Sequence, residues 1–214
     1  MQSKRPITPD DVVLAPTLSD PQVSPDGSNV AFVLGEASRV GQHEKTAIWL
    51  MPVAGDEPAR PFTSGDAHDF GPRWSPEGRF LAFISDRHER GKPQPYLIAV
   101  QGGEAERLPE LKGEVKSLYW SPDGAMLAAI VVDAEPEERD RQVKDLDDAM
   151  VFGADWRFAH LWTIRLADRQ VNQVTSGESH AVSPAWSPDS SRIALITVDS
   201  PWADATYSPA LIDC

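Results

Sequence analysis

This chain of 214 residues has only one cysteine, and it lacks long apolar runs and an export signal. Its single cysteine, Cys214, rules out an intrachain disulfide and suits the reducing cytosol. No apolar stretch approaches the roughly 18 to 20 residues that span a bilayer, so we expect no membrane partner. The opening segment, Met1 to Pro6, is followed by acidic residues and not by an apolar signal-peptide core. These absences predict a cytoplasmic location.

Positive charge and metal-binding patterns are also scarce. The chain has 20 Lys and Arg against 33 Asp and Glu, a formal net charge of −13, which disfavours nucleic acid as a partner. The histidines show no metal-ligand spacing and no cysteine pair exists, so no metal is expected. They are His43, His68, His88, His160 and His180. Gly102-Gly103 reads as a β-turn and not as a phosphate loop, and no cofactor is expected.

What the sequence does contain is a repeat. A Ser-Pro corner recurs four times, as VSPDG at 23–27, WSPEG at 74–78, WSPDG at 120–124 and WSPDS at 186–190. Proline sets φ for the first central position of a type I turn, and glycine accepts the left-handed conformation that closes a hairpin. Ser190 replaces that glycine, which predicts a strained turn or a turn of another type.

Each corner is followed by apolar runs that predict strands. The run directly after the corner is apolar on both faces, as in a strand buried on both sides; the runs are 30–34, 80–84, 126–132 and 193–196. A third strand and a short polar fourth strand follow in three copies, at 48–53 and 60–63, 96–100 and 105–108, and 161–166 and 173–175. Four antiparallel strands in about 45 to 50 residues are typical of a propeller blade. A β-sandwich also has short strands, but it does not repeat the same motifs in the same order. The tryptophans of the corners are interpreted as packing between blades.

The spacing of the motifs predicts an all-β, partial β-propeller with three complete blades and one incomplete blade. We expect a lead-in at 1–18 with a short helix after Thr8-Pro9, and blades at about 19–65, 66–112, 113–178 and 179–214. The third blade carries an insertion of about 20 residues at 133–160, in the place of a surface loop. The fourth blade reaches only part of its third strand, so we expect a fragment or truncated gene product with open edges.

The residues resemble the N-terminal propeller of prolyl oligopeptidase-family serine peptidases, in the acylaminoacyl-peptidase and dipeptidyl-aminopeptidase branch. The resemblance rests on ITPDD at 7–11, FISDR at 83–87, GGEAERL at 102–108 and the four corners, and it covers essentially the whole chain. The corner alone is weak evidence, because TolB-like propellers share it. The family implies a C-terminal α/β-hydrolase domain as partner, with the catalytic serine in a Gly-x-Ser-x-Gly elbow, and short peptides as substrates.

This chain lacks that elbow. The nearest string, GESHA at 177–181, has no final glycine, and Ser179 beside His180 is interpreted as a loop pair. We therefore predict no catalytic residue and an inactive isolated chain, and leave open whether it is part of an enzyme. Some aminopeptidases of the resembled family hold a substrate's amino terminus with propeller glutamates, which makes Glu137 and Glu138 the candidate substrate-binding pair. A solvated charged loop is the simpler interpretation of that pair.

Three functions compete at this point. The first is the substrate-gating portion of a cytoplasmic serine peptidase that hydrolyses short or acylated peptides. The second is a stand-alone TolB-like propeller that binds a protein or a glycan, and the third is a degenerate product without function. The absence of an export signal counts against the second.

Overall fold

The computed structural model describes residues 7–8, 15–35, 43–135, 157–199 and 207–213, and every regular element within them is a β-strand. The strands form four separate antiparallel sheets, each made from consecutive strands. This confirms the all-β class. The expected helix after Thr8 lies outside the described residues apart from Thr8 itself.

Each sheet is one blade, with its strands in sequence order. Blade 1 contains β1 (Thr17–Val23), β2 (Asn29–Gly35), β3 (Thr46–Pro52) and β4 (Arg60–Pro61). Blade 2 contains β5 (Asp69–Trp74), β6 (Phe80–Ser85), β7 (Gln94–Ala99) and β8 (Glu106–Arg107). Blade 3 contains β9 (Glu114–Trp120), β10 (Met126–Val132), β11 (Ala159–Arg165) and β12 (Val171–Gln173). Blade 4 contains β13 (His180–Trp186), β14 (Arg192–Val198) and β15 (Tyr207–Asp213).

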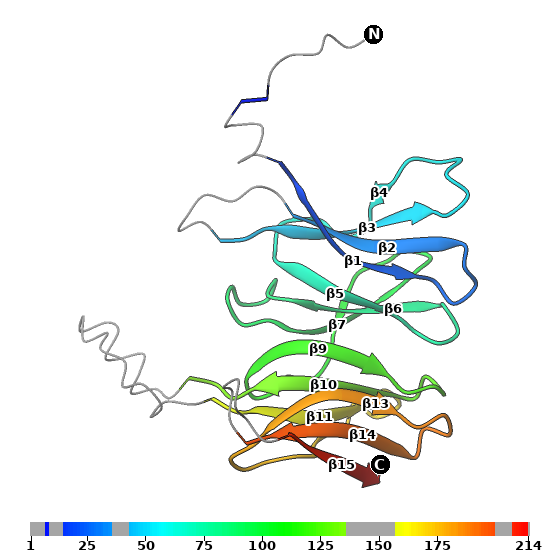
Figure 1. Cartoon of the computed structure of the whole chain (residues 1–214). Helices are drawn as coiled ribbons and strands as arrows, with labels where there is room; N and C mark the ends of the chain where they lie inside the picture. The colour runs from blue at the N-terminus through cyan, green and yellow to red at the C-terminus, as the bar shows by residue number, and fades with distance from the viewer. Residues whose placement is uncertain (1–6, 9–14, 36–42, 136–156, 200–206, 214) are drawn as a thin grey trace, which may run out of the picture.

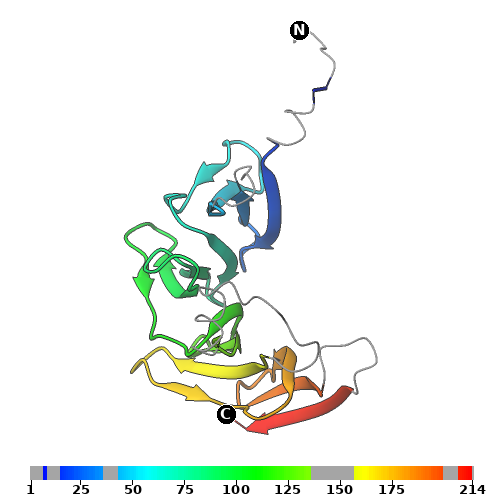
Figure 2. The same cartoon turned by 90° about the vertical axis from the view of Figure 1, so that its left-hand side faces the viewer.

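The blades follow one another along an open arc (Figures 1 and 2). Their first strands line the inside of this arc, where β1 contacts β5, β5 contacts β9, and β9 contacts β13. The sheets therefore fan about an axis and do not stack as two layers. This is the open partial propeller that the repeat predicts.

The core lies between the blades. Three apolar clusters each join two neighbouring sheets, and β6 and β10 are buried on both faces along almost their whole length. An alanine seven residues after each corner serine marks the face that meets the next blade: Ala31, Ala82 and Ala128 are all fully buried. Burial of apolar area is the main stabilising force here, at about 25 cal/mol per Å².

The second strand of blade 4, β14, was expected to be buried on both faces, but only one of its faces is buried. Exposed and buried residues alternate along β14, and Ile196 is 38% exposed. Ala194 holds the position of the buried alanines of the other blades and is exposed. The side facing blade 3 is covered, whereas no described residue covers the other side. The apolar character of β14 thus matches the other blades, and only its surroundings differ.

Three further details concern positions that the sequence analysis singled out. β1 begins at Thr17, two residues before the approximate start of the first blade. β11 begins at Ala159, next to the approximate end of the insertion expected at 133–160. Of the two alternatives predicted for Ser190, the structure shows the strained turn: its φ is 61°, in the left-handed region that favours glycine, and its N–H bonds to the Ser187 carbonyl as in the other corners.

Candidate functional site

The Ser-Pro corners share one hydrogen-bonding pattern. In blade 1 the Gly27 N–H donates to the Ser24 carbonyl at 2.8 Å, and the Ser24 hydroxyl donates to the Asp26 carboxylate at 2.6 Å. The hydrogen bond from Ser24, with two more from Ser28, lowers the pKa of Asp26 to about 2. The corner of blade 4 does the same to Asp189, whose pKa is also about 2. These carboxylates are therefore ionised at any physiological pH.

The tryptophan before each corner fastens its blade to the preceding one. The indole N–H of Trp74 donates to the Gln22 carbonyl at 2.9 Å, that of Trp120 to the Arg73 carbonyl at 3.0 Å, and that of Trp186 to the Tyr119 carbonyl at 3.2 Å. The acceptor is always the residue before the equivalent position of the preceding blade. This agrees with interpreting the tryptophans as packing between blades, and it adds a directed bond to that packing.

β-Bulges shape the inner strands next to these tryptophans. The register shifts between Ser19 and Gln22 in β1, between Phe70 and Arg73 in β5, and between Val182 and Ala185 in β13. Asp20 and Ser183, within two of these bulges, have φ values of 47° and 50°. Such strain in residues other than glycine is common where a strand redirects a side chain, often beside a functional site. Here the bulge presents Asp20 to Arg73, at 2.6 Å.

These features meet in a groove of about 380 Å³ on the inner side of the arc, which we call the axial groove. All four inner strands contribute to its lining: Gln22, Val23, Pro25, Arg73, Trp74, Leu118, Tyr119, Trp120, Pro184, Ala185 and Trp186. The groove lies where the inner strands run into the Ser-Pro corners. Its surface is divided almost evenly between polar and apolar atoms, and its one charged lining residue, Arg73, is paired with Asp20.

A buried polar network occupies the opposite end of blades 1 and 2. Asp69 is fully buried and accepts hydrogen bonds from the Ser85 hydroxyl at 2.6 Å and from Arg87 Nη2, which lies 2.9 Å from each carboxylate oxygen. The Arg87 guanidinium also lies over the Phe83 and Tyr96 rings, 4.9 and 5.0 Å from their centroids. All its partners belong to blade 2, so this network holds the blade together.

Asp86 extends the network to blade 1. Its carboxylate accepts the His68 N–H at 2.9 Å and the Gly91 N–H at 3.0 Å, and it lies 2.9 Å from His43 Nε2. Burial raises the pKa of Asp86, but the two hydrogen bonds and the charge of His43 outweigh burial and hold this pKa below its ordinary value. The segment Ser85-Asp86-Arg87 is thus structural, since every described residue that bonds to its side chains belongs to blade 1, blade 2 or their loops.

The base of the third-blade insertion carries a second polar group. His160 is buried, with Nε2 3.4 Å from the Asp133 carboxylate, and Arg157 lies 3.8 Å from Glu114. The Ala159 N–H donates to His180 Nδ1 at 3.2 Å, and burial together with nearby His160 lowers the pKa of His180. His180 is therefore neutral at physiological pH and joins blade 4 to blade 3.

The candidate substrate-binding pair, Glu137 and Glu138, lies outside the described residues, so its role stays a prediction. Ser179 lies in the connection before β13, while His180 is the first residue of that strand and bonds to the backbone of blade 3. Among the described residues, no group of three His, Cys, Asp or Glu side chains could hold a metal ion.

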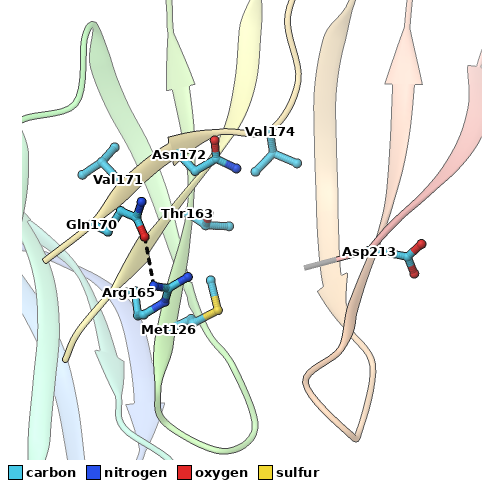
Figure 3. Close-up of a pocket in the computed structure, with 8 residues that line it drawn as sticks. All are labelled: Met126, Thr163, Arg165, Gln170, Val171, Asn172, Val174 and Asp213. Carbon is cyan, nitrogen blue, oxygen red and sulfur yellow. Dashed lines mark hydrogen bonds between the residues drawn. The ribbon is translucent and has the colours of Figure 1, made fainter. Parts of the chain in front are cut away.

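A smaller pocket of about 260 Å³ lies at the outer edge, between blade 3 and the end of β15 (Figure 3). Most of its lining residues are polar or charged, although apolar atoms make up slightly more of its surface, and Arg165 donates to Gln170 within it at 2.9 Å. Asp213 lines it from blade 4, but its carboxylate points away from the other lining residues in Figure 3 and pairs with Arg192 at 2.8 Å. No described Ser, Cys or His side chain lines this pocket, and it shows no catalytic arrangement.

The comparisons with known proteins fit this geometry. Residues 13–151 match the family model of the TolB β-propeller domain. The chain belongs to this family. It is 32% identical over 200 residues to the uncharacterized peptidase YuxL of Bacillus subtilis, a match that covers 87% of this chain and 30% of YuxL. The chain thus spans about a third of the length of that relative.

Solved structures show the same fold. The acylaminoacyl peptidase of Pyrococcus horikoshii superposes with a TM-score of 0.65 at 19% identity, over 95% of this chain and 32% of that one. TolB of Acinetobacter baumannii superposes with a TM-score of 0.54 at 21% identity, over 90% of this chain and 45% of that one. Propellers of this kind thus occur in peptidases and in TolB. No helix among the described residues is long and apolar enough to cross a membrane.

The axial groove is the feature that sequence reasoning missed. The corner tryptophans were assigned to packing, which is where their indole N–H groups are used. A signal for the groove was nevertheless present, because Pro-x-Val at 21–23, Pro-x-Trp at 72–74 and Pro-x-Trp at 184–186 repeat at the same distance from the corner. That repeat places the bulged segments of different blades at the same height about the axis.

Proposed function

We propose that the chain is the substrate-gating propeller portion of a cytoplasmic serine peptidase that hydrolyses short or acylated peptides. The observation that carries the proposal is its match to YuxL along 87% of the chain, at 32% identity. The TM-score of 0.65 to an acylaminoacyl peptidase, against 0.54 to TolB, supports the same reading.

The physical role in the proposal is exclusion. In the proposal, the blades that are fastened by buried clusters and indole hydrogen bonds form one rigid part of the wall around the axis of the parent propeller, and that complete wall keeps folded proteins out. Its partner in the proposal is a C-terminal α/β-hydrolase domain, which supplies the serine, the acid and the histidine. In the proposal this chain supplies selection and no catalytic group.

The decisive experiment reads the coding sequence beyond codon 214 and assays the encoded products. We expect a Gly-x-Ser-x-Gly elbow with later Asp and His, and turnover of a chromogenic acylaminoacyl or peptidyl substrate by the longer product. The 214-residue chain should show no turnover and no labelling by a fluorophosphonate. A frame without an elbow would overturn the proposal and favour a TolB-like module that binds protein or glycan.

Glu137 and Glu138 remain the proposed amine-binding pair. In the hydrolase-bearing product, E137Q together with E138Q should raise KM for dipeptide substrates with a free amino terminus and leave KM for acetylated substrates unchanged. Glu135 → Gln is the matched control, since this exposed residue lies just before the pair. An unchanged KM for free-amine substrates would remove the pair from the proposal.

A further inference from the structure

His180 joins blade 4 to blade 3 through a hydrogen bond that only the neutral ring can make. It is the first residue of β13, which lies against β11 (Figure 1), and its Nδ1 accepts the Ala159 N–H at 3.2 Å. Because Nδ1 is the acceptor, the single proton of the neutral imidazole sits on Nε2. A second proton would occupy Nδ1, turn this acceptor into a donor and set two N–H groups against each other. Protonation therefore breaks the contact directly.

The surroundings of the ring do little to compensate a second proton. His180 Nε2 is buried and has no hydrogen-bond partner among the described residues, and the ring packs against Phe158 with centroids 5.1 Å apart. The next imidazole, that of buried His160, already has its Nε2 3.4 Å from the Asp133 carboxylate. Burial and then His160 lower the pKa of His180, against the opposing charge of Asp133. The closed junction therefore favours the neutral ring.

Other charged side chains lie at the same end of blades 3 and 4. They are Glu114, Lys116, Glu135, Arg157, Glu178 and Asp199. The first of these acids is paired with the two cations of the set. The other three acids are exposed, so solvent and salt screen their charges. His160 and Asp133 are the groups whose charges act on the His180 ring. One carboxylate, 47% exposed, thus serves two imidazoles.

Blade 4 is the blade that protonation can release. Among the described residues it is held to blade 3 by an apolar cluster, the Trp186 indole, the Ser190 hydroxyl and His180. No described residue covers its other side. The Trp186 hydrogen bond is 3.2 Å long, against 2.9 and 3.0 Å at the two preceding junctions. The loss of one contact therefore acts on the blade with the least support.

We propose that the junction of blades 3 and 4 is an acid-sensitive latch, in which protonation of His180 releases the start of β13 from β11. The contribution of His180 is present above the unfolded pKa near 6.5 and is lost as pH falls towards the lower folded pKa. A ring with a pKa near 6.5 in the open junction that stays neutral in the closed one favours opening about tenfold more at pH 5.5 than at pH 7.5. The inference goes beyond the proposed function, because the latch needs no hydrolase domain.

The experiment measures hydrogen exchange of indole N–H groups in the 214-residue chain at pH 7.5 and pH 5.5. Trp186 reports on the junction of blades 3 and 4, and Trp120 on that of blades 2 and 3. The latter junction contains no histidine, since the remaining three are His43 and His68, between blades 1 and 2, and exposed His88. The ratio of the two rates cancels the intrinsic pH dependence of exchange. We expect the Trp186 to Trp120 ratio to rise about tenfold on acidification, and an unchanged ratio would overturn the proposal.

Two matched substitutions assign the effect to one ring. In His180→Asn the side-chain oxygen can accept the Ala159 N–H in place of Nδ1 but does not titrate, so the ratio should be the same at both pH values. His88→Asn removes an exposed histidine and should leave the tenfold rise unchanged. A ratio that still rises in H180N, or that no longer rises in H88N, would refute the assignment.

Histidine signals of the unsubstituted chain give a second test, which does not depend on the folding of a variant. With ¹⁵N-labelled histidine, the His180 ring should be protonated on Nε2 alone at pH 7.5 and should gain its second proton below pH 6.5, the ordinary value of a free imidazole. A proton on Nδ1 at pH 7.5, or titration at pH 6.5 or above, would overturn the latch.

Discussion

Removal of the Asp69 carboxylate should destabilise the chain more than any other single ion-pair substitution that its described residues offer. Asp69 is fully buried and receives two hydrogen bonds from Arg87 and one from Ser85. Asp69 → Ala leaves the guanidinium, whose side chain is 28% exposed, without its counter-ion. Breaking a buried pair in this way costs about 3 to 5 kcal/mol. Since domains have only about 5 to 15 kcal/mol in total, this is a large fraction.

The assay is urea unfolding followed by tryptophan fluorescence, with Asp213 → Ala as the control. Asp213 pairs with Arg192 at 2.8 Å, but its side chain is 85% exposed, so its loss should cost less than about 1 kcal/mol. The double variant Asp69 → Ala, Arg87 → Met should recover part of the loss, because no unpaired charge then remains. Equal costs for D69A and D213A, or no recovery in the double variant, would refute the reasoning.

Three further predictions concern the scaffold. Trp120 → Phe removes one indole hydrogen bond and some apolar area, so it should lower the free energy of unfolding in urea by about 1 to 2 kcal/mol. Trp49 → Phe removes no described hydrogen bond and should lower it by less. Equal losses in the two variants would argue against the indole bonds. Gly113 → Ala should lower the free energy of unfolding by about 3 kcal/mol or more, because the added Cβ would lie 2.2 Å from the Val132 carbonyl oxygen at a φ of 139°. The control Gly27 → Ala meets no atom within 4 Å and should lower it by about 1 to 2 kcal/mol. Similar melting curves for the two variants would contradict the prediction. The pKa of Asp86 is lowered in the folded state, so its carboxylate stabilises the fold above the unfolded pKa near 4, and this stabilisation is lost as pH falls through the lower folded pKa. Asp86 → Asn should therefore make the free energy of unfolding depend less on pH in this acidic range. An unchanged pH dependence would contradict the prediction.

The blades were predictable because their signals are local and repeated. A Ser-Pro corner needs only five adjacent residues, and the apolar runs after it have the strand's length and periodicity. β10 matches the expected run at 126–132 residue for residue. The strained turn at Ser190 was also one of the predicted alternatives. The sequence did not show the distant contact that accompanies it, in which the Ser190 hydroxyl accepts the Asp123 N–H at 3.1 Å.

The groove and the polar network were not predictable, because they form between residues far apart in the chain. Arg73 meets Asp20 across 53 residues, and the Trp186 indole meets the Tyr119 carbonyl across 67. Nothing in the sequence around Asp69 distinguishes it as a buried counter-ion of Arg87. Burial in β14 was also mispredicted, since a strand's pattern records which faces are apolar and not which faces are covered.

The fan of blades joined by tryptophan hydrogen bonds is the central claim, and hydrogen exchange of indole N–H groups tests it most directly. In a chain with ¹⁵N-labelled tryptophan, the signals assigned to Trp74, Trp120 and Trp186 by Phe substitution should exchange slowly, with Trp49 as the fast reference. Exchange of all four at the rate of Trp49 would contradict the claim.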